Sequence, residues 1–167
     1  AASSLAHNED GSAPFIHSEL LFCPPGAASG KDSVAGLACS IVYGGAVHLE
    51  TKRFSRKEWF FRSMTCSKGQ YNEMMSFCQA VKGNGFNHLG YFLYWSPISP
   101  SPMSYTYLGL APRYFCSEVV IAALKAGDIL DESVSTSMHP NDLYKLVKEN
   151  SMANCARSMN SVKLSFV

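Results

Sequence analysis

The first half of the chain carries four short apolar segments that turn-forming residues separate. The segments are rich in β-branched and aromatic residues, and the third alternates Val47, Leu49 and Thr51 along one face. Residues 24–26 and 44–45, which contain only Pro and Gly, mark two of the turns. The expected strands span residues 15–23, 34–43, 46–54 and 58–64. Four consecutive strands joined by short turns predict an antiparallel meander.

In the second half, apolar residues recur every three or four positions, as they do on one face of a helix. This pattern predicts helices over residues 69–82 and 116–127, and a third helix that starts near Pro140. Gly127 suits the end of the second helix. Residues 162–167 form a strand-like closing segment. The chain is therefore expected to be an α+β domain, with an antiparallel sheet of about five strands and helices packed on one side.

The composition is that of a folded domain. Of 167 residues, 47% are hydrophobic and 16% are charged, so the chain can bury a sizeable core. We expect a flexible lead-in over residues 1–14, which is rich in small and polar residues, and a single domain over 15–167. The net charge of +1 gives no indication of a nucleic-acid surface. The longest apolar runs are far shorter than the roughly 20 residues of a transmembrane segment.

The chain contains six cysteines at wide and irregular spacing, with no CxxC pair. They are Cys23, Cys39, Cys66, Cys78, Cys116 and Cys155. A domain of this size does not need disulfides, and no Cys or His pair has zinc-ligand spacing. We therefore expect reduced thiols, no metal, no cofactor and a cytoplasmic location.

Cys116 is the candidate nucleophile. It lies in the first turn of the expected helix, where unpaired backbone N–H groups and the helix dipole favour a thiolate. The alternative is that Cys116 is simply a small apolar residue at a packed helix start. Glu118, two residues later, is expected to complement the dipole, with support of the nucleophile as the other interpretation.

Four segments together resemble one enzyme family. They are His17-Ser18-Glu19, the Gly-x-x-x-x-Gly segment at 85–90, Phe-Cys-Ser-Glu-Val-Val at 115–120, and Pro-Asn-Asp-Leu-Tyr at 140–144. In order and character they are similar to the circularly permuted NlpC/P60-like branch of the papain-fold cysteine hydrolases. This branch includes YiiX-like amidases, a poxvirus group and lecithin:retinol acyltransferase-like enzymes. Its catalytic His precedes the Cys, so the resemblance implies a permuted papain-like fold in which His17 and Cys116 act together.

A third catalytic residue is expected to orient the imidazole. Glu19 is the first choice, because strand alternation puts it on the same face as His17. The resemblance also allows a polar residue on the following strand, where Cys39 and Ser40 lie, with His48 beyond them.

The predicted function is that of a thiol hydrolase, a peptidase, amidase or acyl hydrolase. It would cleave an amide, ester or thioester through an acyl-enzyme intermediate. The expected substrate is a peptide, a protein conjugate or a lipid acyl group inside a cell, the host cell if the protein is viral. The aromatic segment 91–95 is either core or an apolar wall for such a group, and the Pro-rich segment 96–102 is a flap or a plain connection. The alternative function is a non-catalytic protein- or lipid-binding module on the same fold.

Overall fold

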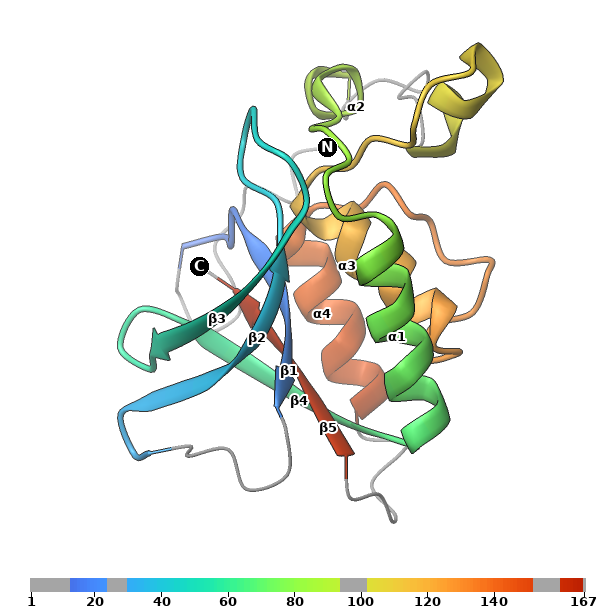
Figure 1. The fold of residues 1–167 in the computed structure, drawn as a ribbon. Helices are drawn as coiled ribbons and strands as arrows, with labels where there is room; N and C mark the ends of the chain where they lie inside the picture. The colour runs from blue at the N-terminus through green and yellow to red at the C-terminus, as the bar shows by residue number, and fades with distance from the viewer. Residues whose placement is uncertain (1–12, 24–29, 94–101, 152–159, 167) are drawn as a thin grey trace.

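The computed structural model describes residues 13–23, 30–93, 102–151 and 160–166. Some predicted segments therefore lie outside the described residues: most of the lead-in over 1–14, Cys155, residues 94–95 of the aromatic segment, and residues 96–101 of the Pro-rich segment 96–102. The elements of the described part follow an α+β arrangement (Figure 1).

The described strands form one antiparallel sheet in the order β3-β2-β1-β5-β4. They are β1 (Ser18–Cys23), β2 (Ser33–Ser40), β3 (His48–Ser55), β4 (Phe60–Cys66) and β5 (Asn160–Phe166). The predicted antiparallel sheet packed against helices is confirmed. The predicted meander is wrong beyond β3, because β5 lies between β1 and β4. All six residues of β1 are buried, and a strand so deeply buried pairs on both of its edges.

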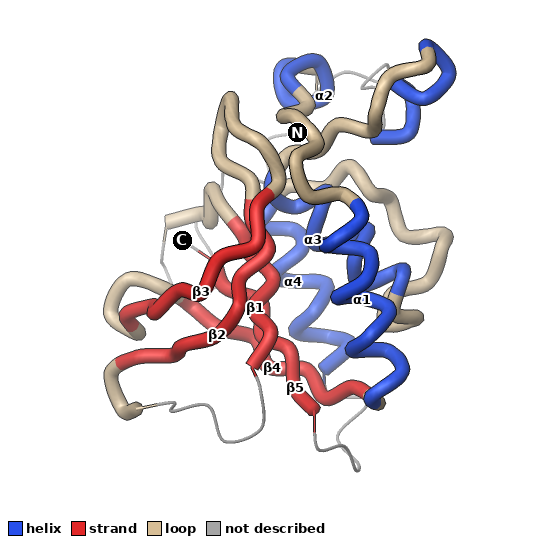
Figure 2. The backbone as a smooth tube through the Cα atoms, in the orientation of Figure 1, coloured by secondary structure: helices blue, strands red, loops and turns tan. Residues whose placement is uncertain are grey.

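Three longer helices cover the same face of the sheet (Figures 1 and 2). They are α1 (Lys68–Ala80), α3 (Cys116–Ala126) and α4 (Pro140–Ser151), while α2 (His88–Phe92) and the 3₁₀-helix η2 (Pro102–Leu108) are short. Ser67 caps α1 by accepting from the Gln70 backbone N–H at 3.1 Å. Gly127 ends α3 as predicted, and a Cβ at this position would lie 2.6 Å from Cγ of Met74 on α1. The close approach of α1 and α3 therefore requires glycine there.

Side chains of β1 alternate between two apolar clusters, one on each face of the sheet. Leu20 and Phe22 belong to the large cluster under the helices, whereas Leu21 and Cys23 belong to a smaller one on the opposite face. His17 was expected on the first strand, but the strand begins one residue later, at Ser18. His17 therefore lies at the end of the sheet, within reach of elements on either face.

The start of β1, the β2–β3 loop, α2 and the start of α3 gather at one end of the molecule, which is the upper end in Figure 1. The candidate site lies at this end.

Candidate functional site

Cys116 is the first residue of α3, as the sequence predicts. Its side chain is buried, with 8% of the residue exposed. Phe115 precedes the helix in an extended conformation, and its backbone N–H donates to Oε2 of Glu118 at 3.0 Å. This bond fixes the turn that leads into the helix, and with it the backbone of Cys116.

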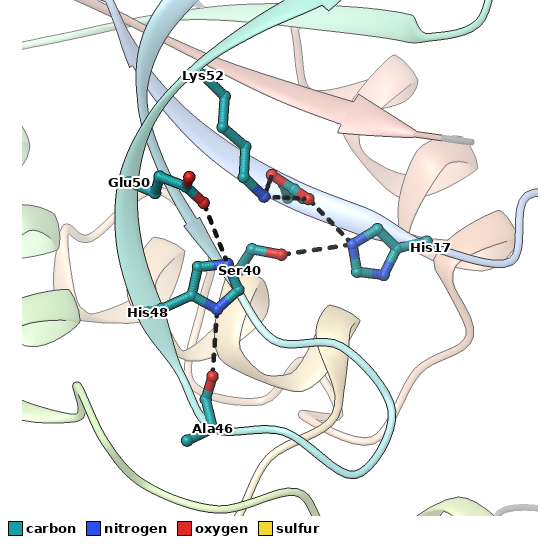
Figure 3. Close-up of polar contacts among 7 residues, drawn as sticks. His17, Ser40, Ala46, His48, Glu50 and Lys52 are labelled. Atoms are coloured by element: carbon teal, nitrogen blue, oxygen red, sulfur yellow. Dashed lines mark hydrogen bonds and ion pairs between the residues drawn. The ribbon is translucent and has the colours of Figure 1, made fainter.

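The structure brings His17 and Cys116 together, close enough for the Cys116 side chain to raise the pKa of the His17 ring. The other partners of the His17 ring lie on its Nε2 atom. Nε2 is 3.2 Å from Oε1 of Glu19 and 3.4 Å from Oγ of Ser40 (Figure 3). The ring also meets the Trp59 ring edge-on, with 6.1 Å between centroids.

Burial alone would lower the pKa of His17. The polar interactions with Cys116 and Glu19, and the negative charge that each partner can carry, outweigh burial and raise the pKa to about 9. The imidazole is thus built to hold a proton at neutral pH.

Glu19 is buried, yet it keeps its charge. Burial raises the pKa of its carboxyl group, but the hydrogen bond from His17, the charge and hydrogen bonds of Lys52, and the Ser40 hydroxyl together lower it below its usual value. Lys52 Nζ donates to both carboxylate oxygens of Glu19, at 3.1 and 3.2 Å. The strand register allows this contact. Lys52 on β3 pairs with Gly36 on β2, and strand alternation then puts the Lys52 side chain on the same face of the sheet as Glu19.

The other sequence-predicted alternatives have different places. Figure 3 shows the His48 ring directed toward the Ala46 carbonyl and the Glu50 carboxylate, at 3.2 and 4.0 Å. Cys39 faces the helices within the large apolar cluster. Glu19 and Ser40 are therefore the expected third residues that contact the His17 ring.

Sequence reasoning missed a second buried carboxylate group, Glu118, as the centre of a hydrogen-bond network. Asn87 Nδ2 donates to its Oε2 at 3.1 Å, and Ser137 Oγ donates to its Oε1 at 2.9 Å. Burial raises the pKa of Glu118 to about 7, although the donors from Phe115, Asn87 and Ser137 partly offset this rise. The available signal was an Asn between Gly85 and Gly90, in the segment that resembles the family.

An aromatic surface adjoins the site. Tyr43, Tyr91 and Phe92 are exposed, and the Tyr43 ring meets both of the others edge-on. Tyr91 also contacts Phe115, the residue before Cys116, with 6.4 Å between ring centroids. The segment that begins at Tyr91 is thus surface rather than core as far as the structure describes it.

Within the described ranges, no group of three or more His, Cys, Asp or Glu side chains is arranged to hold a metal ion. The five described cysteines are free thiols. None of the helices in the same ranges has the length and apolarity needed to cross a bilayer.

Comparisons with protein-family models, with curated proteins and with solved structures found no match.

Proposed function

We propose that the protein is a cysteine hydrolase in which Cys116 is the nucleophile, His17 the acid–base group and Glu19 the residue that orients His17. The observation that carries this proposal is that Cys116, at a helix start, lies close enough to the His17 ring to raise its pKa, while Glu19 contacts the same ring. A nucleophile bonded to a base, which a third group orients in turn, is the arrangement that covalent catalysis uses.

The two ring nitrogens of His17 have different roles. With Nε2–H donating to Glu19, Nδ1 is the nitrogen that takes the thiol proton. The Cys116 sulfur attacks the carbonyl carbon of an amide, ester or thioester, and backbone N–H groups at the start of α3 stabilise the oxyanion. The His17 imidazolium then protonates the leaving amine, alcohol or thiol. Water, which gives its proton to His17, hydrolyses the acyl-enzyme and restores the thiol.

The chain order supports the permuted papain-like (NlpC/P60) fold as the finer description of this domain. His17 precedes the central strand of an antiparallel sheet, and Cys116 begins a helix packed on that sheet. The same order and element types characterise the family that the sequence resembles.

The aromatic surface beside Cys116 favours an apolar acyl group, as in a lipid or a hydrophobic peptide side chain. Exposed Tyr43, Tyr91 and Phe92 lie on the β2–β3 loop and α2, which Figure 1 shows at the end where α3 begins. We therefore place an acyl substrate with a long apolar chain, or a peptide with such a side chain, ahead of a small polar one.

The test is covalent trapping. Intact mass spectrometry would follow adducts of p-nitrophenyl esters and peptide chloromethyl ketones with the wild type and with Cys116→Ala. The matched control is Cys23→Ala, because Cys23 is 7% exposed and Cys116 is 8% exposed. We expect one adduct in the wild type and in Cys23→Ala, and none in Cys116→Ala. Equal labelling of Cys116→Ala would overturn the proposal.

The second candidate is a binding module on the same fold, favoured by the exposed aromatic residues. It predicts that probes with apolar chains bind reversibly, that Cys116 forms no adduct faster than Cys23 does, and that Cys116→Ala binds as tightly as the wild type.

A further inference from the structure

We propose that Glu118 and Asn87 act as one pair of positioning residues, which aligns the Cys116 thiol with the aromatic surface that receives the acyl group. The inference rests on the proposed function and assigns to it two residues outside the Cys116–His17–Glu19 set.

Glu118 gathers donors from three segments of the chain. Its carboxylate accepts from the Phe115 backbone at 3.0 Å, from Asn87 Nδ2 at 3.1 Å and from Ser137 Oγ at 2.9 Å. The residue is completely buried. Because the first of these donors directly precedes Cys116, a shift of the Glu118 carboxylate would move the nucleophile.

Asn87 connects the same carboxylate to the aromatic segment. Its Oδ1 accepts from the Gly90 backbone at 2.8 Å and from the Tyr105 hydroxyl at 2.7 Å. These two donors determine the orientation of the amide, so its NH₂ group faces Glu118. Asn87 also donates its backbone N–H to the Tyr114 carbonyl at 2.9 Å. Asn87 is thus bonded on both sides of the junction between α2 and the start of α3.

Gly90 shows how closely this junction is fitted. A Cβ at Gly90 would lie 2.1 Å from Asn87 Nδ2, so any larger residue would displace the amide. Tyr91, the next residue on α2, contacts Phe115. The Asn87–Glu118 pair therefore determines where the aromatic side chains lie relative to the thiol.

The Glu118 carboxyl group accepts from neutral donors. In the part of the chain that the structure describes, its ionisable neighbours are the phenols of Tyr105 and Tyr114, with Arg113 beyond the Tyr105 ring. Its pKa of about 7 means that its charge changes near neutral pH. Ser137 can satisfy both forms, because a hydroxyl can either donate to a carboxylate or accept from a carboxylic acid.

The test exchanges the carboxylate of Glu118 and the amide of Asn87. Glu118→Gln turns an amide N–H toward that of Asn87 or of Phe115, and Asn87→Asp sets one carboxyl against another. The double variant Asn87→Asp/Glu118→Gln again provides acceptors for Gly90, Tyr105 and Phe115, and an amide N–H between the two side chains. We expect each single variant to lower kcat/KM for p-nitrophenyl octanoate by about 10- to 100-fold, and the double variant to recover most of this loss.

Two further readouts separate positioning from folding and from the proposed function. The ratio of octanoate to acetate turnover should fall in the single variants, since the acetyl group does not reach the aromatic surface. Cys116 alkylation by iodoacetamide, followed from pH 5.5 to 9, reports alignment even if neither ester is a substrate. The wild-type profile should have an inflection near pH 7 that Glu118→Gln lacks. If neither ester is hydrolysed but the inflection is present, the proposed hydrolase function is wrong and the positioning role of Glu118 and Asn87 is supported.

Should a single variant fail to fold, Ser137→Ala removes one donor without creating a clash, and it should lower the octanoate-to-acetate ratio about two- to tenfold. The proposal is wrong if folded single variants, or Ser137→Ala, keep the wild-type ratio and alkylation profile. It is also wrong if the double variant folds with wild-type thermal stability yet recovers neither.

Discussion

The two buried carboxyl groups near the Cys116–His17 pair have opposite properties. Glu19 is 3% exposed and Glu118 is fully buried, so desolvation raises the pKa of both. The pKa of Glu19 is nevertheless lowered below its ordinary value, whereas that of Glu118 is raised to about 7. Two buried carboxyl groups thus differ in charge: one is an anion, and the other titrates at neutral pH.

The difference arises from the partners. Glu19 faces the Lys52 ammonium and the His17 imidazole, and both can carry a positive charge. Glu118 faces backbone, amide and hydroxyl donors, which stabilise an anion through dipoles alone. A buried charge needs a counter-charge, and neutral hydrogen bonds only partly replace it. The comparison suggests that Glu19 supports an imidazolium and that Glu118 holds a backbone in place.

The largest effect is expected from removing the group that Glu19 supports. His17→Ala should lower ester hydrolysis at least about 10³-fold, and combining it with Cys116→Ala should add little, because the two act as a unit. Steady-state kinetics with p-nitrophenyl octanoate measures this, with circular dichroism to verify folding. Activity within tenfold of the wild type in His17→Ala would break the pairing.

Glu19→Gln should have the next largest effect. The amide cannot supply the negative charge that stabilises the imidazolium, so we expect turnover to fall roughly 10- to 1,000-fold. The pKa of His17 should also fall from about 9, because one of the groups that raise it is gone. NMR titration of the His17 ring measures this change. Glu50→Gln is the matched control, since the Glu50 carboxylate is exposed on β3, and an equal loss there would refute the assignment.

The same comparison predicts opposite pH dependences of stability. The pKa of Glu118 is higher in the folded state, so its contribution to stability is fully present below about pH 4.5 and is lost as pH rises through 7. The full decline is about 3 kcal/mol. The pKa of Glu19 is lower in the folded state, so its contribution is present above about pH 4.5 and is lost as pH falls below that.

Urea unfolding at pH 5 and pH 7.5 tests the Glu118 contribution. The wild type should lose more unfolding free energy between these values than Glu118→Gln does. The His17 contribution, which declines as pH rises from 6.5 through 9, is common to both proteins and cancels in the difference. Identical pH slopes in the two proteins would show that Glu118 has an ordinary pKa.

Local patterns were enough to predict most elements of the fold. Alternation and helical spacing identify the strands and longer helices, since they depend on neighbouring residues. Strand order does not depend on neighbouring residues, because β5 lies between β1 and β4 through contacts with strands that are far away in the sequence. The sequence pattern thus predicted a sheet with helices on one side, while the meander it suggested is correct for β1 to β3 and wrong for β4.

In the candidate site, too, local patterns predict some residues, whereas the roles of others depend on contacts between distant segments. Cys116 was identifiable from its helix start, and Glu19 from alternation with His17. The roles of Lys52 and Asn87 depend on strand register and on the junction between α2 and α3, which no local pattern encodes. For Glu118 the sequence favoured a role with the helix dipole over support of the nucleophile, because the donors around it come from distant segments.

The smallest predicted effect distinguishes Ser40 from His48, the two alternatives to Glu19 on neighbouring strands. Ser40 Oγ lies 3.4 Å from the His17 ring, and its hydroxyl also helps to lower the pKa of Glu19, so it interacts with both groups. Ser40→Ala removes a neutral hydrogen bond while Glu19 and Lys52 stay in place. We expect turnover to fall about two- to tenfold, the cost of one such bond. His48→Ala should leave turnover unchanged, because that ring contacts Ala46 and Glu50 instead. Parallel kcat measurements on both variants test this order. A larger loss in His48→Ala than in Ser40→Ala would move the orienting role to β3 and leave Glu19 as a charge partner of Lys52.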